Sequence, residues 1–220
     1  MAFVQLAEGE LHYQLDGPAN APVLVLSNSL GTDLQMWDAQ IAAFSKHFRV
    51  LRFDTRGHGK SLVTPGPYSI EQLGHDVLAL LDALHIDKAH FCGLSMGGLI
   101  GQWLGIHAGE RLNKLVVCNT AAKIGDPSIW NPRIETVLRD GAAAMVALRD
   151  ADFREQLSSI KAPLLVIAGT EDAVTPPSGG HFIQEHVQGA EYAEFYAAHL
   201  SNVQADAAFS ERVLAFLNAH

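Results

Sequence analysis

The sequence predicts an α/β fold, in which a mostly parallel sheet of about eight strands is covered by helices on both faces. Two observations support this prediction. Short apolar runs recur along the 220 residues, and most of them are continuously apolar, as in strands that are buried on both faces. Helical patterns alternate with these runs, which is typical of parallel sheets with crossover helices.

The predicted strands differ in pattern along the chain. "FVQLA" and "ELHYQL" alternate between apolar and polar residues and are separated by Gly9, so they are predicted to form a hairpin. The later strands are expected in the runs "PVLVLSNS", "FRVLRFD", "KAHFCGLS", "KLVVCNT", "PLLVIAGT" and "AEYAEFYA".

Helices are expected between and after these strands. Ser69 and Gln72 form a capping-box pattern at the start of one of them. The helical segments are "LQMWDAQIAAF", "SIEQLGHDVLALLDALHI", "MGGLIGQWLGIHAG", "SGGHFIQEHV" and the terminal "ADAAFSERVLAFLNA".

Residues 121–162 interrupt the alternation, because they lie between two strands and contain only helix-like sequence. A connection of this length in a compact domain is usually a lid or a binding element. A plain crossover helix with irregular ends is the alternative. We therefore expect one domain with its core in residues 1–120 and 163–220 and a helical insertion at 121–162.

Composition and charge exclude several classes of protein. The net charge of −9 disfavours nucleic-acid binding and means that an anionic substrate needs a local cation. The sequence shows no signal peptide and no apolar run that would cross a membrane, so a cytoplasmic protein is expected. Cys92 and Cys118 are expected to be reduced, buried thiols, and no metal site or cofactor is predicted.

The segment "GLSMG" is the clearest chemical signal. Gly93, Ser95 and Gly97 match the pattern G-x-S-x-G, with a predicted strand before it and a predicted helix after it. This context is typical of a nucleophile elbow, a sharp turn that exposes a serine hydroxyl above the sheet edge. A structural glycine turn is the alternative reading.

A nucleophilic serine needs a base and an acid that orients the base. Glu171 and Asp172 both follow the strand "PLLVIAGT", where the acid is expected. Of the four histidines that come later, His199 lies in a loop after the strand "AEYAEFYA" and is the predicted base. The others are His181 and His186, in a helical pattern, and the terminal His220.

An oxyanion requires two backbone donors. One is expected from the N–H of Met96, the residue that follows the serine. The other is expected from the loop "SNSLGTD" after the strand "PVLVL", where we assign Leu30. A polar loop without catalytic importance is the alternative for this segment.

The motifs together resemble the α/β-hydrolase superfamily over nearly the whole chain: "NSLGTDLQMWDAQ", "RFDTRGHGKS", "GLSMGG", "GTEDAVTPP" and "AAHLSNVQADAAF" occur in the expected order. "SNSLGTDLQMWD", "HLSNV" and "WNPRIETVLRDG" more closely resemble the 3-oxoadipate enol-lactonases. The resemblance implies a Ser95–Asp172–His199 triad without metal or organic cofactor. It also implies hydrolysis of a small enol-lactone with an acetate arm, in bacterial catabolism of aromatic compounds.

The chain departs from this family in the insertion. About half of the expected lid is absent, through a natural reduction or an introduced deletion, with the junction near 148–150. A shorter lid leaves the pocket open and exposes apolar surface, through which the chain could form a homo-oligomer. Arg133, or less favourably Arg56, is the predicted cation for the substrate carboxylate, and Trp130 either walls the pocket or anchors the lid.

Two main rival functions remain open at this stage, and a carbon–carbon hydrolase is a further alternative that shares the triad but is disfavoured by the "NSLGTD" loop. A promiscuous esterase would keep the triad but lose the lactone specificity. A folded but inactive scaffold would keep the triad only as a relic.

Overall fold

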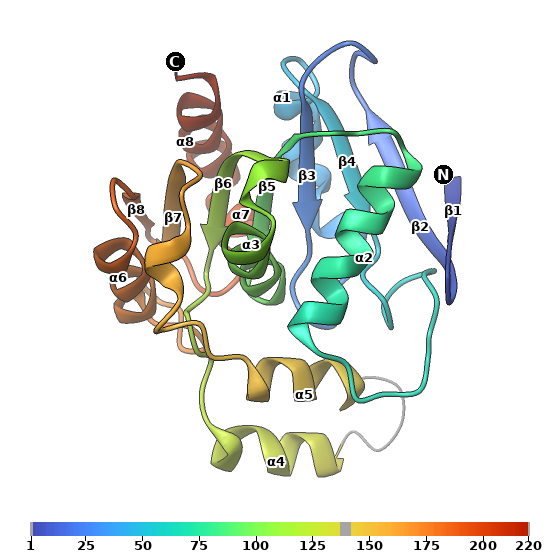
Figure 1. The fold of residues 1–220 in the computed structure, drawn as a ribbon. Coiled ribbons are helices and arrows are strands. Elements are labelled where there is room, and N and C mark those ends of the chain that lie inside the picture. Colours follow the sequence, from blue (N-terminus) through green and yellow to red (C-terminus); the bar gives the residue numbers. More distant parts are fainter. Residues whose placement is uncertain (1, 137–141, 220) are drawn as a thin grey trace.

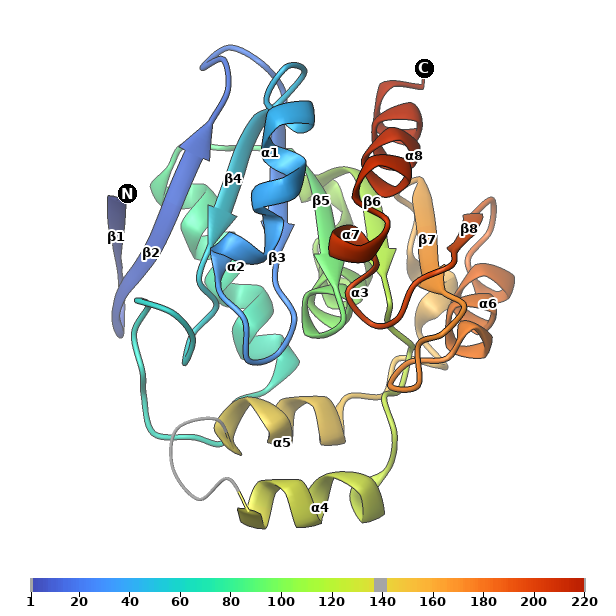
Figure 2. The ribbon, with the colours of Figure 1, turned by 180° about the vertical axis from the view of Figure 1, so that it is seen from behind.

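The computed structural model describes residues 2–136 and 142–219. These residues form an eight-stranded sheet in the order β1-β2-β4-β3-β5-β6-β7-β8, in which β4, β3, β5, β6, β7 and β8 are parallel to one another and β2 is antiparallel to both β1 and β4 (Figures 1 and 2). The strands are β1 (Ala2–Leu6), β2 (Gly9–Asp16), β3 (Val23–Ser27), β4 (Arg49–Phe53), β5 (Ala89–Leu94), β6 (Leu112–Cys118), β7 (Leu164–Gly169) and β8 (Glu191–Phe195). Thus each predicted strand forms, and β1 and β2 make the expected antiparallel hairpin.

The strand order places the crevice of the sheet between β3 and β5. From β3 the chain turns to β4 on one side, and it then crosses over to β5 on the other side. In open α/β sheets, ligands bind at the carboxyl ends of the strands at such a switch point. The predicted nucleophile follows β5 and the predicted oxyanion loop follows β3, so both lie at this crevice.

Helices cover both faces of the sheet, as the sequence predicts (Figures 1 and 2). One face carries α2 (Ile70–Ala83), α3 (Met96–His107) and α6 (Pro177–His186), and the other carries α1 (Asp38–Phe44) and α8 (Asp206–Asn218). Ser69 caps α2, because its hydroxyl accepts a hydrogen bond from the Gln72 N–H at 3.0 Å. Each face buries its own apolar cluster, centred on Leu73, Phe91 and Leu115 in one case and on Trp37, Phe44 and Phe209 in the other.

Two local features differ from the predicted helices. The segment before α1 is a 3₁₀ helix, Leu34–Trp37, because Asp33 caps it through the Gln35 N–H and Asp54 accepts from the Leu34 N–H. The helix predicted over "LQMWDAQIAAF" therefore forms as this 3₁₀ helix followed by α1. A short helix, α7 (Ser201–Gln204), precedes α8 and follows directly after the loop of His199. By contrast, α7 has only 4 residues and is too short for an apolar period, which is why the sequence did not indicate it.

The insertion lies across the carboxyl ends of the strands. Its two helices, α4 (Pro127–Thr136) and α5 (Ala142–Asp150), pack on each other, with α5 nearer to the sheet (Figures 1 and 2). The Phe153 N–H donates to the Ala122 carbonyl at 2.9 Å, so the two ends of the insertion are joined at its base. Residues 137–141 of the predicted insertion lie outside the described residues, and so does His220.

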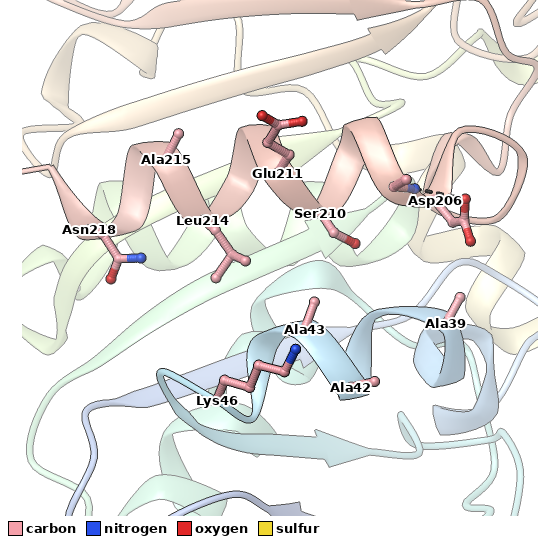
Figure 3. Close-up of a pocket in the computed structure, with 11 residues that line it drawn as sticks. Ala39, Ala42, Ala43, Lys46, Asp206, Ser210, Glu211, Leu214, Ala215 and Asn218 are labelled. Atoms are coloured by element: carbon pink, nitrogen blue, oxygen red, sulfur yellow. Dashed lines mark hydrogen bonds between the residues drawn. The ribbon is translucent and has the colours of Figure 1, made fainter.

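A groove of about 630 Å³ runs between α1 and α8, on the face opposite α2 and α3 (Figure 3). Alanines from both helices line much of it, including Ala39, Ala43 and Ala215, and Lys46 and Glu211 lie along it. None of the predicted site residues lines this groove. In the two described ranges, no helix is long and apolar enough to cross a membrane.

Candidate active site

Ser95 occupies a strained turn between β5 and α3. Its backbone lies at φ 58° and ψ −111°, a region that residues with a side chain rarely adopt. The turn is held from the neighbouring strand, because the Ser95 N–H donates to the Cys118 carbonyl at 2.9 Å. The turn therefore has the geometry that the sequence predicts for a nucleophile elbow.

The glycines of the elbow are required by packing. A Cβ on Gly93 would lie 2.1 Å from the Gly97 carbonyl oxygen, and a Cβ on Gly97 would lie 2.2 Å from the Ser27 carbonyl oxygen. Both neighbours are backbone atoms that a side chain cannot displace without moving the strand or the helix. The close approach of β3, β5 and α3 thus depends on glycine at these two positions.

The predicted oxyanion donors lie on two segments that are bonded to each other. Met96 is the first residue of α3, so its N–H has no acceptor within the helix. The next N–H, of Gly97, donates at 3.0 Å to the carbonyl of Asn28 in the loop after β3. Leu30 lies two residues further along this loop and is partly buried.

Side-chain hydrogen bonds also hold the loop after β3. The Asn28 side chain donates to the Phe53 carbonyl at 2.9 Å and accepts from the Trp37 indole N–H at 3.1 Å. Asp54, at the end of β4, accepts from the N–H of Leu34 at 2.8 Å. The loop that carries Leu30 is therefore fixed to β4 as well as to the elbow.

Asp172 and His199 are in direct contact. His199 Nδ1 lies 2.8 Å from Asp172 Oδ2, and the Asp172 side chain is fully buried, whereas that of His199 is about one-quarter exposed (23%). The neighbouring Glu171 points into solvent. Of the two acids that the sequence leaves open, Asp172 is thus the one that contacts the imidazole. His181 and His186 are exposed on α6, as expected.

Several donors keep Asp172 ionised. Burial alone would raise the pKa of this carboxyl, but the hydrogen bonds from His199, Thr175 and Asn119 outweigh burial and hold the pKa well below its usual range. The Thr175 hydroxyl donates to Oδ2 at 2.7 Å, and the N–H groups of Val174 and Thr175 donate to Oδ1 at 2.8 and 3.0 Å. A charged carboxylate in this position stabilises a protonated imidazole.

Sequence reasoning missed Asn119, Thr120 and Thr175. Asn119 follows β6 in the left-handed region, at φ 46°, and donates to Asp172 Oδ2 at 3.1 Å. The Thr120 hydroxyl donates to the Ser95 carbonyl at 3.0 Å. The available signal was their place in the sequence. Asn119 and Thr120 directly follow one buried strand, and Thr175 lies in the loop after another.

The predicted substrate-binding residues lie on α4. Trp130 is buried, and its indole N–H donates to the Ile124 carbonyl at 2.6 Å, so this side chain anchors the insertion. Arg133 is exposed, with its guanidinium 5.4 Å from the centroid of the Trp130 ring. Arg56 has the structural role that the sequence favours for it: it is buried and bonded to Asp76, which raises the pKa of the guanidinium, and to Glu8.

Comparisons with known proteins identify the family of the chain. Residues 22–137 match the α/β-hydrolase fold family. The chain is 42% identical to 3-oxoadipate enol-lactonase 2 of Acinetobacter baylyi over 247 aligned positions, which cover 94% of this chain and 92% of the relative. It is 41% identical to the enol-lactonase of Burkholderia xenovorans LB400, whose crystal structure it matches with a TM-score of 0.94 over 99% of this chain and 100% of that one.

A hydrolase from Pseudomonas aeruginosa PA01 is similar to the same degree, with 43% identity and a TM-score of 0.97 over 99% of this chain and 98% of that one. The match to the family model covers more than half of the chain, and the enol-lactonase relatives cover nearly all of it. The chain therefore belongs to the α/β-hydrolase family, within which it is a carboxylic-ester hydrolase similar to the 3-oxoadipate enol-lactonases.

Proposed function

We propose that the chain hydrolyses 3-oxoadipate enol-lactone to 3-oxoadipate through a Ser95–His199–Asp172 triad. The observation that carries the proposal is the 2.8 Å contact between His199 and the buried Asp172, at the same sheet edge as the strained Ser95 turn. The identity to two enol-lactonases of Acinetobacter supports the choice of substrate. Such a reaction belongs to the bacterial breakdown of aromatic compounds.

The first half of the reaction opens the lactone ring. His199 takes the proton of the Ser95 hydroxyl while the Ser95 oxygen attacks the lactone carbonyl carbon. Asp172 holds the imidazole through Nδ1 and stabilises its protonated form. The bond between the carbonyl carbon and the ring oxygen then breaks, and the enolate that leaves takes a proton from His199. The product of this half is a ring-opened ester on Ser95.

The second half releases the acid. His199 takes a proton from water as the water oxygen attacks the ester carbon, and it returns that proton to the Ser95 oxygen when the ester bond breaks. In both halves the carbonyl oxygen becomes negative and binds to the N–H groups of Leu30 and Met96. Each such donor is typically worth ~10²–10³-fold in rate.

A reduced lid would favour a second candidate function. The alignment with the Acinetobacter relative runs over 247 positions, more than the 220 residues of this chain, so the relative has residues that this chain lacks. This difference agrees with a reduced lid. A lid excludes water and orients the substrate, so its reduction favours a promiscuous esterase that accepts small activated esters.

The deciding experiment compares initial rates with 3-oxoadipate enol-lactone and with p-nitrophenyl acetate, using one preparation of the protein and Ser95→Ala as the control. Lactone turnover that far exceeds aryl-ester turnover, and that Ser95→Ala abolishes, supports the proposed lactonase. Aryl-ester turnover with little lactone turnover supports the esterase instead.

A separate measurement tests whether the triad works at all. A fluorophosphonate that attacks activated serines should label Ser95 in the wild-type protein and leave Ser95→Ala unlabelled. A wild-type protein that resists labelling would be an inactive scaffold, and both proposed reactions would then be wrong.

A further inference from the structure

The residues at the end of β6 connect the Ser95 turn to Asp172. The Cys118 carbonyl accepts from the Ser95 N–H at 2.9 Å, and the Thr120 hydroxyl donates to the Ser95 carbonyl at 3.0 Å. Between these two residues, the Asn119 side chain donates to Asp172 Oδ2. Three consecutive residues thus bond to the nucleophile turn on one side and to the acid on the other.

Asn119 also reaches the loop that carries His199. Its Nδ2 donates to the carbonyl of Ala198, the residue directly before His199, at 3.2 Å. Its Oδ1 accepts from the hydroxyl of Ser201, two residues after His199. Because the Asp172 carboxylate and the Ala198 carbonyl only accept hydrogen bonds, the NH₂ end of the amide must face them, and its oxygen accepts from the Ser201 hydroxyl.

Burial makes these contacts consequential. Asn119 and Ser201 are 1% and 0% exposed, so water does not replace a lost partner in either case. The backbone of Asn119 is held as well, because its N–H donates to the Ile167 carbonyl at 2.8 Å. Asn202, the residue after Ser201, also holds the loop of His199, because its side chain donates to the Met36 carbonyl at 2.9 Å.

We propose that Asn119 and Ser201 are positioning residues of the triad, which hold the Asp172 carboxylate and the His199 loop in one fixed arrangement. This proposal rests on the proposed function, since it presupposes that His199 acts on Ser95. Ser201 holds the oxygen end of the Asn119 amide, and the NH₂ end of that amide holds Asp172 Oδ2 and the backbone before His199. Neither residue touches the substrate.

Asn119 affects the triad because it is one of several hydrogen-bond donors to a single oxygen of Asp172. Asp172 Oδ2 accepts from His199, from Thr175 and from Asn119. Among the described residues that contact His199, Asp172 supplies the charge and the Thr175 hydroxyl, at 3.4 Å from Nδ1, is neutral. Without the Ser201 hydroxyl, the buried Asn119 amide oxygen loses this donor, so the amide holds the Asp172 carboxylate and the loop of His199 less firmly.

The first test is Ser201→Ala, with Ser210→Ala as the matched control. Ser210 is also buried, but it lies on α8 at the groove of Figure 3. Ser201→Ala should lower kcat and the rate of fluorophosphonate labelling by ~10-fold, with KM changed less than about twofold. Ser210→Ala should leave both rates unchanged. Thermal unfolding of each variant shows that the protein is folded at the assay temperature.

The second test is Asn119→Asp, with Asn113→Asp as its control for the added charge. Asn113 is exposed near the other end of the same strand. Two buried carboxyl groups this close cannot both ionise near neutral pH, so the pair binds a proton and the pH profile of kcat/KM should gain an ionisation that the wild type lacks. Asn113→Asp should leave the profile in place. If Asn119→Asp does not fold, Ser201→Ala alone decides.

The outcomes separate this proposal from the proposed function. If Ser201→Ala is less stable but is labelled and turns over substrate at the wild-type rates, its role is only structural and the proposal is wrong. If the wild type is labelled but ignores the lactone, the lactonase assignment fails, while a slower labelling of Ser201→Ala still supports the positioning role. If the wild type is never labelled, both fail.

Discussion

The carboxyl ends of the central strands and the insertion above them differ in how tightly they hold their residues. Ser95 and Asp172 are 3% exposed each, and backbone or side-chain hydrogen bonds from neighbouring strands fix both. In the insertion, Trp130 is fixed in the same way, but Arg133 projects from α4 and is exposed.

This difference separates the chemistry of the site from its specificity. The proposed triad lies on elements that depend on the fold itself, so a change in the insertion leaves its geometry in place. The groups proposed to recognise the substrate lie on α4, which packs on α5, and α5 lies between α4 and the sheet (Figure 1). The following predictions test whether the two regions are as independent as this comparison suggests.

The largest effect is expected from Asp172→Asn. The amide has nearly the same shape, but its NH₂ group no longer accepts from His199 and selects the wrong tautomer of the imidazole. The value of kcat should fall by ~10⁴-fold for the lactone and for an aryl ester alike. Steady-state kinetics with both substrates measures this. Glu171→Gln is the control, because that side chain points into solvent.

A loss for one substrate only would contradict the comparison, since it would mean that Asp172 acts through substrate recognition rather than through His199.

A smaller effect is expected from Gly97→Ala, which alters the elbow without touching the triad. The new Cβ would lie 2.2 Å from the Ser27 carbonyl oxygen, so α3 has to move away from β3. A shift of this kind displaces the Met96 N–H and should cost ~10²-fold in kcat. The added strain should lower the free energy of unfolding by about 1–3 kcal/mol.

The control for this substitution is Gly109→Ala, where a Cβ meets no atom within 4 Å. Denaturant unfolding of both variants measures the change in stability, and steady-state rates measure the change in kcat. Equal stability of the two variants would show that the elbow does not need its glycine.

The sequence predicted the strands and the elbow because each depends on local pattern, whereas the choice of Asp172 as the partner of His199 came mainly from the resemblance to a known family. Continuous apolar runs indicate buried strands, and G-x-S-x-G between a strand and a helix indicates a sharp turn. The role of Asn119 could not be predicted, because its partners Asp172 and Ser201 are 53 and 82 residues away along the chain. The exposure of Arg133 was equally inaccessible, since the orientation of α4 depends on packing.

A third effect concerns stability in acid. The pKa of Asp172 lies below its unfolded value of about 3.9, so its contribution is fully present above that value and is lost as the pH falls towards the folded-state pKa. Between pH 6 and pH 3, the wild type should lose about 1 kcal/mol of unfolding free energy more than Asp172→Asn does. Urea unfolding at a series of pH values measures the difference. Parallel curves for the two proteins would show that Asp172 is not stabilised by its donors.

The smallest effect is expected from Arg133→Gln in the insertion. The protein carries a net charge of −9, so the exposed cation of Arg133 in the insertion is expected to attract an anionic substrate that the rest of the surface repels. Its removal should raise KM for the lactone, which carries a carboxylate, by less than ~10-fold and should leave kcat unchanged. The change should shrink as salt is added.

The neutral ester p-nitrophenyl acetate should show no change in this variant. Arg154→Gln is the matched control, because Arg154 is also exposed but already pairs with Asp152 at 2.7 Å. If Arg133→Gln lowers kcat for both substrates, α4 contributes to the chemistry itself, and the insertion and the strand ends are coupled rather than independent. If only the lactone KM rises, Arg133 binds the carboxylate, and the insertion carries part of the specificity.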